Sequence, residues 1–247
     1  MSRFLTTIPK FVDLLCDVQD SDRDAVVVIT GDTGEGKSVF LWIMLCDLAE
    51  KRGVFFDPVE QLIYERSEFN TAVDEVPELT GLGIDEAVGV FYSRDYHDDQ
   101  QIALLKKLDR IRYRRLVLGM AIPNLFHIDK HIRDSRVRYW VFIESRKGKG
   151  KGGYVHAYIF EKEKNPFNND PWNLNYNKKL YSRGKIDKSR NYIGEIIYKD
   201  IPVAEYKIYN KIKDTKRKIA ESLEWQRAIS RKRKYGKTGE KYDSRLG

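Results

Sequence analysis

The chain has 247 residues, 41% of them hydrophobic, which is enough for one sizeable core with an appendage. No apolar run reaches the length of a membrane span, the N-terminal segment lacks a signal-peptide cleavage site, and Cys16 and Cys46 are far apart, so we expect a cytoplasmic protein. Residues 1–100 carry 8 Lys/Arg and 21 Asp/Glu, whereas residues 101–247 carry 37 and 16. This asymmetry favours a polyanionic partner for the basic half, and a solvated charged surface is the alternative.

The first predicted elements are a short amphipathic helix over 8–18, a buried strand over 26–30 and a helix over 38–52 that ends at Gly53. The turn between the strand and the second helix reads GDTGEGKS and fits the phosphate-loop pattern G-x-x-x-x-G-K-[ST]. Glycines let backbone N–H groups surround phosphate oxygens, the lysine reaches the β- and γ-phosphates, and the serine hydroxyl binds Mg²⁺. The predicted nucleotide-binding residues are Gly31, Asp32, Thr33, Gly34, Glu35, Gly36, Lys37, Ser38 and Val39.

A second acidic motif follows further along the chain. We expect a short strand over 62–65, a helix with Ser67 as its N-cap, and a strand that ends at Asp85 and Glu86. A carboxylate at a strand end can share the Mg²⁺ with Ser38, and this role is assigned to Asp85. The adjacent Glu86 can orient and deprotonate an attacking water. The alternative is a solvated pair of acidic residues at a helix start.

The next elements are a helix between 98 and 115, a buried strand over 116–122, a short helix over 128–134, and a hairpin of strands over 137–145 and 154–162. Strands alternating with helices indicate an α/β fold with a mostly parallel sheet. Asn124 follows the 116–122 strand and is a candidate contact for the γ-phosphate or the attacking water. A turn role after Pro123 is the alternative.

The composition changes after residue 163. The stretch 165–179 is rich in Asn and Pro and indicates a loop or linker, with one more strand over 191–201 and a helix over 203–229. From Lys207 to Lys241 there are 13 Lys/Arg against 4 Asp/Glu, which favours contact with nucleic acid over a disordered tail. We therefore predict a P-loop ATPase domain over 1–163, and a linker, extra strand and basic helical extension over 164–247.

The segments GDTGEGKS, GIDEA, LLKKLDRIRYRRLVLGMAIPN and IDKHIRDSRVRYWVFIE together resemble small ATPases of the HerA–FtsK superfamily, including zonula-occludens-toxin-like and DNA-translocating viral or plasmid members. The resemblance implies a RecA/FtsK-like additional-strand fold with helices on both faces of the sheet, ATP and Mg²⁺ as ligands, and a homo-oligomeric ring that moves DNA. It also implies a nucleotide role for Arg112, Arg133 and Arg136, one of them across a subunit interface; exposed ion pairs are the alternative. Many members carry Gln or Thr-Gln where this chain has Pro123 and Asn124.

Together these features predict a Mg²⁺-dependent ATPase that couples hydrolysis to translocation or packaging of DNA, duplex rather than single-stranded, for a virus or a plasmid-like element. Two alternatives remain: a helicase loader of the AAA+ type, and a non-hydrolysing nucleotide-dependent DNA-binding switch. A zinc site at His127 and His131 is not favoured, because no cysteine or Glu-x-x pattern accompanies the pair.

Overall fold

The computed structural model describes residues 5–85, 99–130, 132–146, 154–165, 168–199, 205, 207–219 and 222. The chain divides into two compact units, Met1–Pro202 and Val203–Gly247. The predicted boundary at 163/164 stays a prediction about functional domains. In the second unit, residues 207–219 are helical. Glu86, His131 and the basic tail over 223–247 lie outside the described residues.

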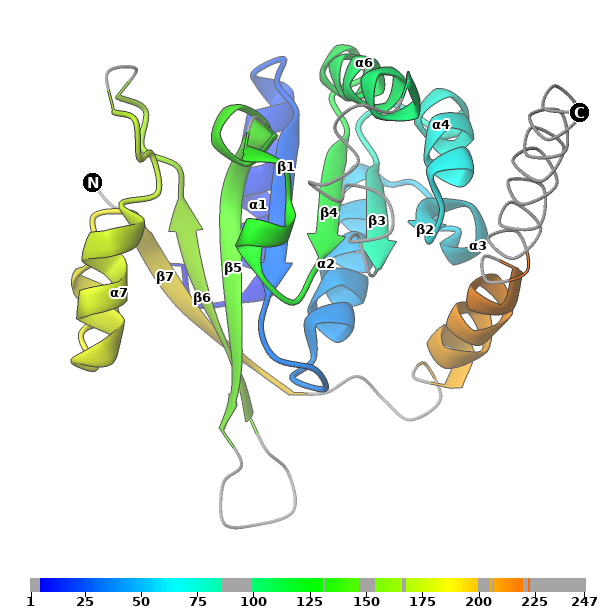
Figure 1. The fold of residues 1–247 in the computed structure, drawn as a ribbon. Coiled ribbons are helices and arrows are strands. Elements are labelled where there is room, and N and C mark those ends of the chain that lie inside the picture. Colours follow the sequence, from blue (N-terminus) through cyan, green and yellow to red (C-terminus); the bar gives the residue numbers. More distant parts are fainter. Residues whose placement is uncertain are drawn as a thin grey trace, which may run out of the picture. The chain divides into compact units, whose positions relative to one another are not determined.

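The first unit is built on a seven-stranded sheet in the order β2-β3-β4-β1-β5-β6-β7 (Figure 1). The central strand β1 pairs in parallel with β4 and β5, and β3 pairs in parallel with β2 and β4. The hairpin of β5 and β6 and the final strand β7 add an antiparallel edge. The strands are β1 (Ala25–Thr30), β2 (Leu62–Ile63), β3 (Gly81–Asp85), β4 (Val117–Ala121), β5 (Val137–Arg146), β6 (Tyr154–Glu161) and β7 (Tyr192–Tyr198).

Helices cover both faces of this sheet, as predicted. The α-helices are α1 (Ile8–Asp20), α2 (Lys37–Arg52), α3 (Pro58–Gln61), α4 (Arg66–Glu75), α6 (Asp99–Tyr113) and α7 (Leu174–Ser182). The short helices are η2 (Leu125–His127), the π-helix η3 (Ile132–Arg136) and η4 (Ile186–Lys188). Among the described residues, no helix is both long and apolar enough to cross a bilayer.

Two strand glycines bring α2 close to one face of the sheet. A Cβ added to Gly119 would lie 2.3 Å from Leu41 Cδ1, and one added to Gly83 would lie 2.8 Å from Leu45 Cδ1. Real Cβ atoms do not approach other atoms so closely, so the absence of a side chain lets the helix pack directly on β3 and β4. This close packing fixes the start of α2, and with it the glycine loop, against the sheet.

The opposite face carries the larger apolar cluster. Alternate residues of β1 point into it because successive strand side chains face opposite sides of a sheet. Apolar residues of α4 and α6 cover this face, and Trp172 is a fully buried member of the same cluster. The Trp172 indole N–H donates to the carbonyl oxygen of Arg133 in η3 at 3.2 Å. The fully buried members of the cluster include Val26, Val28, Phe69, Val73, Leu118, Ile111 and Trp172.

Three sequence predictions of local structure are wrong. The predicted helix over 128–134 is replaced by η2, which ends at His127 before this range, and by the π-helix η3, which overlaps only its last three residues. Glu65, not Ser67, is the N-cap of α4, and the Ser67 hydroxyl donates to the Glu65 carboxylate at 3.2 Å. The predicted linker over 165–179 contains the start of α7, because burial of Trp172 and Leu180 outweighs the weak helix propensity of its asparagines.

Candidate nucleotide-binding site

The glycine loop joins β1 to α2 at the carboxyl end of β1, at the lower edge of the sheet in Figure 1. Gly34 and Gly36 have φ angles of 84° and 94°, which side chains rarely adopt. A Cβ on Gly31 would lie 2.5 Å from the carbonyl oxygen of Ile143 on β5. These three positions therefore require glycine, and the loop backbone can turn its N–H groups toward one ligand.

The other loop residues hold this turn or lie at its surface. The Glu35 carboxylate accepts a hydrogen bond from the Asp32 backbone N–H at 3.1 Å, and the Glu35 N–H donates to the Asp32 carbonyl at 3.3 Å. The Lys37 ammonium donates to the carbonyl oxygens of Gly31 and Asp32 at 2.8 and 2.7 Å. Its charge therefore lies inside the loop, where a phosphate group would bind. Thr33 is exposed and Val39 is buried.

Ser38 and Asp85 meet beside the loop. The Ser38 hydroxyl donates to Asp85 Oδ1 at 2.8 Å, although the two residues are 47 positions apart. Asp85 is the last residue of β3 and only 2% of its surface is exposed. Strand β4 lies between β1 and β3, so the sheet order itself brings the acidic strand end to the edge where the loop lies.

This pair fits a Mg²⁺ ion. A serine hydroxyl and a carboxylate are oxygen ligands of the kind Mg²⁺ prefers. Within the described residues there is no group of three or more His, Cys, Asp or Glu side chains that could hold a metal alone. A Mg²⁺ at Ser38 and Asp85 would therefore take its remaining ligands from the nucleotide and from water, as this ion commonly does.

Two side chains from strands β7 and β5 make hydrogen bonds to the glycine loop and to the end of β1, and the sequence patterns did not indicate either contact. The Tyr198 hydroxyl donates to the Gly36 carbonyl at 3.2 Å, and its ring meets Phe40 of α2 edge-on at 5.6 Å. On β5, the Trp140 indole N–H donates to the Thr30 hydroxyl at 2.7 Å. Both contacts join distant parts of the chain, so no local pattern could have indicated them.

Asn124 lies beyond the end of β4, at the same edge as Asp85, because Asp85 pairs with Ala121. Its side-chain oxygen accepts a hydrogen bond from the Phe126 backbone N–H at 2.9 Å and caps η2. Asn124 is exposed, and its capping contact is that of a turn residue. A contact between Asn124 and the nucleotide stays a prediction.

The three candidate arginines do not meet the loop of their own chain. Arg112 is near the end of α6, which leads into β4, while Arg133 and Arg136 are in η3 directly before β5. All three therefore lie at the amino edge of the parallel strands. Strand β1 has six residues, so its two ends are about 20 Å apart.

Arg133 and Arg136 already make ion pairs, and their side chains are largely buried, unlike the exposed ion pairs of the alternative interpretation. Arg133 Nε donates to Asp134 at 2.8 Å, and Arg136 pairs with Asp24 at 3.3 Å and Asp109 at 3.5 Å. Burial raises the pKa of Asp24, and the Arg136 guanidinium opposes this shift.

The strand order and the glycine loop define the class. A parallel sheet with the phosphate loop after its central strand, and with one strand inserted between that strand and the acidic one, is the additional-strand type of P-loop NTPase fold. The predicted fold class is therefore confirmed for the first unit.

Neither a protein-family model nor a curated protein matches this chain. Among solved structures, the N-terminal domain of zonular occludens toxin from Neisseria meningitidis is 13% identical, with a TM-score of 0.45, and the match covers 72% of this chain and 95% of that one. The genome packaging NTPase B204 of Sulfolobus turreted icosahedral virus 2, in complex with ATP-gammaS, is 14% identical, with a TM-score of 0.39 and coverage of 56% and 92%.

The ATPase DotB of Legionella pneumophila is 13% identical, with a TM-score of 0.38, and the match covers 75% of this chain and 60% of that one. The first two of these proteins are of the kinds named by the sequence resemblance. Because the identities and TM-scores are low, we argue the function from the residues of this chain.

Proposed function

We propose that this chain is a Mg²⁺-dependent ATPase that uses hydrolysis to translocate or package DNA. The observation that carries the ATPase part is the 2.8 Å hydrogen bond between the Ser38 hydroxyl and the buried Asp85 carboxylate, beside the lysine of the glycine loop. A serine and a strand-end carboxylate at this place are the two protein ligands of the nucleotide-bound Mg²⁺ in P-loop NTPases.

Each residue of the site then has a separate task. The loop N–H groups and Lys37 bind and orient the β- and γ-phosphates. Ser38 and Asp85 hold Mg²⁺, which when bound offsets the negative charge of the phosphates. Glu86, which follows the metal-binding aspartate in the sequence, is proposed to accept a proton from the attacking water, as a carboxylate can. ATP is proposed over GTP from the sequence resemblance, and the sequence contains no Asn-Lys-x-Asp element of the kind that GTPases use to recognise the base.

The DNA part of the proposal rests on charge. The net charge of residues 101–247 is +21, and neutralisation of phosphates by Lys and Arg gives affinity that does not depend on sequence. A homo-oligomeric ring is proposed from the sequence resemblance, and the placement of the arginines is compatible with it. Since Arg112, Arg133 and Arg136 lie at the amino edge, a nucleotide role for them requires the phosphates of a neighbouring copy.

The ATPase proposal is tested with Lys37→Ala and Glu86→Gln in the full chain. We expect both variants to lose ATP turnover by about 100-fold or more, since each removes a group that acts on the transferred phosphoryl or its attacking water. Glu86→Gln should still bind ATP, because the loop and the Mg²⁺ ligands are unchanged. Phosphate release and binding of a fluorescent ATP analogue are the measurements.

Lys179→Ala, which removes an exposed lysine of α7, is the matched control and should turn over ATP as the unmodified chain does. Full turnover by either site variant would contradict the site. Turnover should rise with duplex DNA more than with single strands. An ATPase indifferent to all DNA would retain the site and refute the translocation part, leaving the loader as the better reading.

A further inference from the structure

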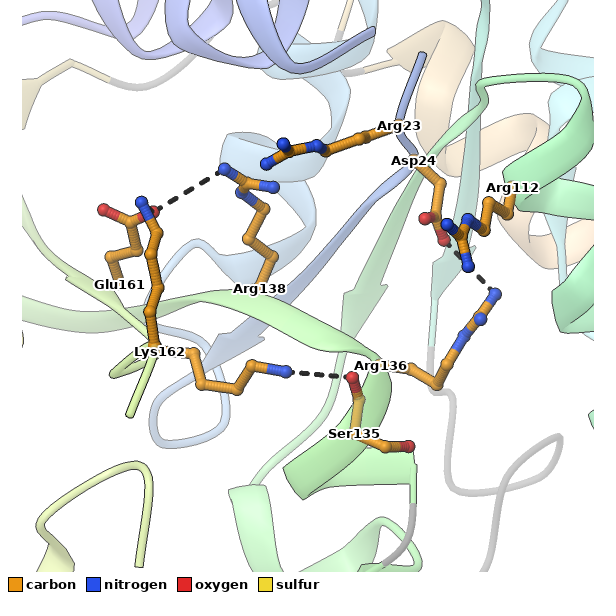
Figure 2. Close-up of a pocket in the computed structure, with 9 residues that line it drawn as sticks. Arg23, Asp24, Arg112, Ser135, Arg136, Arg138, Glu161 and Lys162 are labelled. Carbon is orange, nitrogen blue, oxygen red and sulfur yellow. Dashed lines mark hydrogen bonds and ion pairs between the residues drawn. The ribbon is translucent and has the colours of Figure 1, made fainter. Parts of the chain in front are cut away.

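A cluster of positively charged side chains lies at the amino edge of the parallel strands, at the opposite end of β1 from the glycine loop. A cavity of about 310 Å³ opens there between the start of β1, the end of α6, the start of β5 and the segment after β6 (Figure 2). Six cationic side chains line it, and they come from four separate parts of the chain. These are Arg23, Arg112, Arg136, Arg138, Lys162 and Lys164.

Only two carboxylates line the same cavity. Asp24 pairs with Arg136 at 3.3 Å, and Glu161 pairs with Arg138 at 3.8 Å and Lys164 at 3.4 Å. Six cationic and two acidic side chains leave an excess of four positive charges in a half-enclosed space. Like charges held this close repel one another unless an anion lies between them.

Two of the cations are not tied up in hydrogen bonds or ion pairs among the described residues, although the Arg112 guanidinium is near enough to Asp24 to oppose the rise of that carboxyl's pKa. Arg23 and Arg112 are exposed, and within the described part of the chain neither side chain makes a hydrogen bond or an ion pair. Lys162 donates to the carbonyl oxygens of Ser135 and Asp134 at 2.9 and 3.3 Å. These bonds hold its ammonium group at the cavity, which Ser135 also lines. Burial, and then the neighbouring Arg138, lower the pKa of Lys162.

The surroundings limit the size of the anion. The adjoining hollow that shares Arg112 is lined by three carboxylates and two arginines, and the hollow that shares Lys162 and Lys164 is lined by these two lysines, Lys130 and two carboxylates. The positive excess is therefore largest in the cavity: its sign reverses in the first hollow, and it falls to one charge in the second. This arrangement suits a compact anion of high charge and not a long acidic chain lying across the whole edge.

We propose that this cavity binds a compact phosphate anion, at a site separate from the glycine loop. Arginine presents several N–H donors in one plane and is well matched to phosphate oxygens, and four arginines converge here. The two sites are about 20 Å apart, the length of β1, so one phosphate chain of a nucleotide does not reach both. The experiment below distinguishes two sources of this anion, free inorganic phosphate or pyrophosphate and the phosphate of a nucleic-acid backbone, and the proposal does not depend on ATP hydrolysis.

The experiment uses the full chain carrying Lys37→Ala, which disables the glycine loop. Inorganic pyrophosphate is titrated into this protein by calorimetry at low ionic strength, with and without the added changes Arg23→Gln and Arg112→Gln. We expect the Lys37→Ala protein to bind pyrophosphate and the added pair to weaken that binding by at least about tenfold. Lys179→Gln with Arg183→Gln removes the same charge from exposed positions of α7 and its end, and should leave affinity nearly unchanged.

Binding of a labelled DNA duplex by the same proteins distinguishes the two sources. A loss of both ligands in the Arg23/Arg112 variant assigns the site to a nucleic-acid phosphate, whereas a loss of pyrophosphate alone assigns it to free phosphate. Equal pyrophosphate affinity in the pocket and control variants, or no binding at all once Lys37 is replaced, would overturn the proposal. Thermal unfolding shows whether each variant is folded. If the protein with both Arg23→Gln and Arg112→Gln is not folded, Arg23→Gln alone is used in its place. Because ATP binding is measured separately, loss of this site and failure of the ATPase proposal give different results.

Discussion

At the scale of single residues, the phosphate-binding chemistry depends on contacts between distant positions. Lys37 lies within its own loop, but the Ser38 hydroxyl reaches a carboxylate that a different strand supplies. A buried carboxylate is costly unless it is hydrogen-bonded, and this serine provides one such bond to Asp85. In the proposed function, the Ser38 hydroxyl would coordinate a Mg²⁺ ion together with Asp85, in place of its hydrogen bond to that carboxylate.

Tyr198 gives the first prediction at this scale. Replacement of Tyr198 by Phe keeps the ring against Phe40 but removes the hydroxyl that donates to the Gly36 carbonyl. A hydrogen bond of this kind contributes about 1 kcal/mol, so we expect ATP affinity to fall by about fivefold as the loop becomes less fixed. Titration of a fluorescent ATP analogue measures this change.

Tyr176→Phe removes a hydroxyl from a half-exposed tyrosine of α7 and is the matched control. It should bind ATP as the unmodified chain does. Unchanged ATP affinity in the Tyr198→Phe protein would show that β7 does not position the loop, whatever the effect on stability.

At the scale of whole elements, α4 and α6 are joined across the sheet face by charge as well as by apolar packing. Asp74 of α4 accepts hydrogen bonds from Lys107 and Arg110 of α6, and these bonds lower the pKa of the Asp74 carboxyl. All three side chains are partly exposed, so the pairs contribute under about 1 kcal/mol. The contribution depends on Asp74 being ionised.

The sign of the pH effect follows from this lowered pKa. The unfolded chain binds the Asp74 proton more tightly than the folded one, so the stability gained from ionised Asp74 is present above the ordinary pKa of 3.8 and is lost as pH falls through the lowered value. We expect Asp74→Asn to unfold at lower denaturant than the unmodified chain at pH 7, and the difference to shrink as the pH is lowered beyond the ordinary pKa of 3.8. Urea unfolding followed by circular dichroism measures it.

Glu75→Gln, at an exposed neighbour on the same helix, should have little effect at either pH. A difference between Asp74→Asn and the unmodified chain that persists undiminished at low pH would mean that packing, and not charge, joins the two helices.

The glycine loop and the central strands could be predicted from sequence because they are local patterns. The stretch 26–29 is apolar throughout, as expected of a strand covered on both faces, and the glycines of the phosphate loop follow directly. Helix α7 could not be predicted, because its asparagines favour turns and only the burial of Leu180 and Trp172 makes it a helix. The positions of Tyr198 and of the cations around Lys162 depend on the pairing of β5, β6 and β7, which no local pattern specifies.

At the scale of the whole molecule, acidic and basic residues are unevenly distributed along the sequence, and this distribution determines which part of the chain a polyanion would bind. The phosphate loop lies in the acidic part of the sequence, whereas the excess of Lys and Arg begins after residue 100 and continues to the end. Under the proposed function, the basic part of the chain would attract a nucleic acid, and the acidic part that carries the phosphate loop would repel it. Two kinds of phosphate ligand can then bind without competing for the same cations.

The last prediction concerns the basic run RKRK at 231–234. We expect replacement of all four by glutamine to weaken duplex binding and to flatten its salt dependence, because each phosphate contact releases about one condensed counterion. If all four residues contact phosphates, the slope of log K against log salt should fall by up to about four. The measurement is fluorescence anisotropy of a labelled duplex over a range of salt.

The matched control replaces four exposed basic residues at α7 by glutamine: Lys178, Lys179, Arg183 and Lys185. It removes the same charge and should leave most of the slope of log K against log salt in place. Equal slopes in the two variants would mean that net charge alone attracts the DNA, and the run at 231–234 would then be no more than part of a solvated surface.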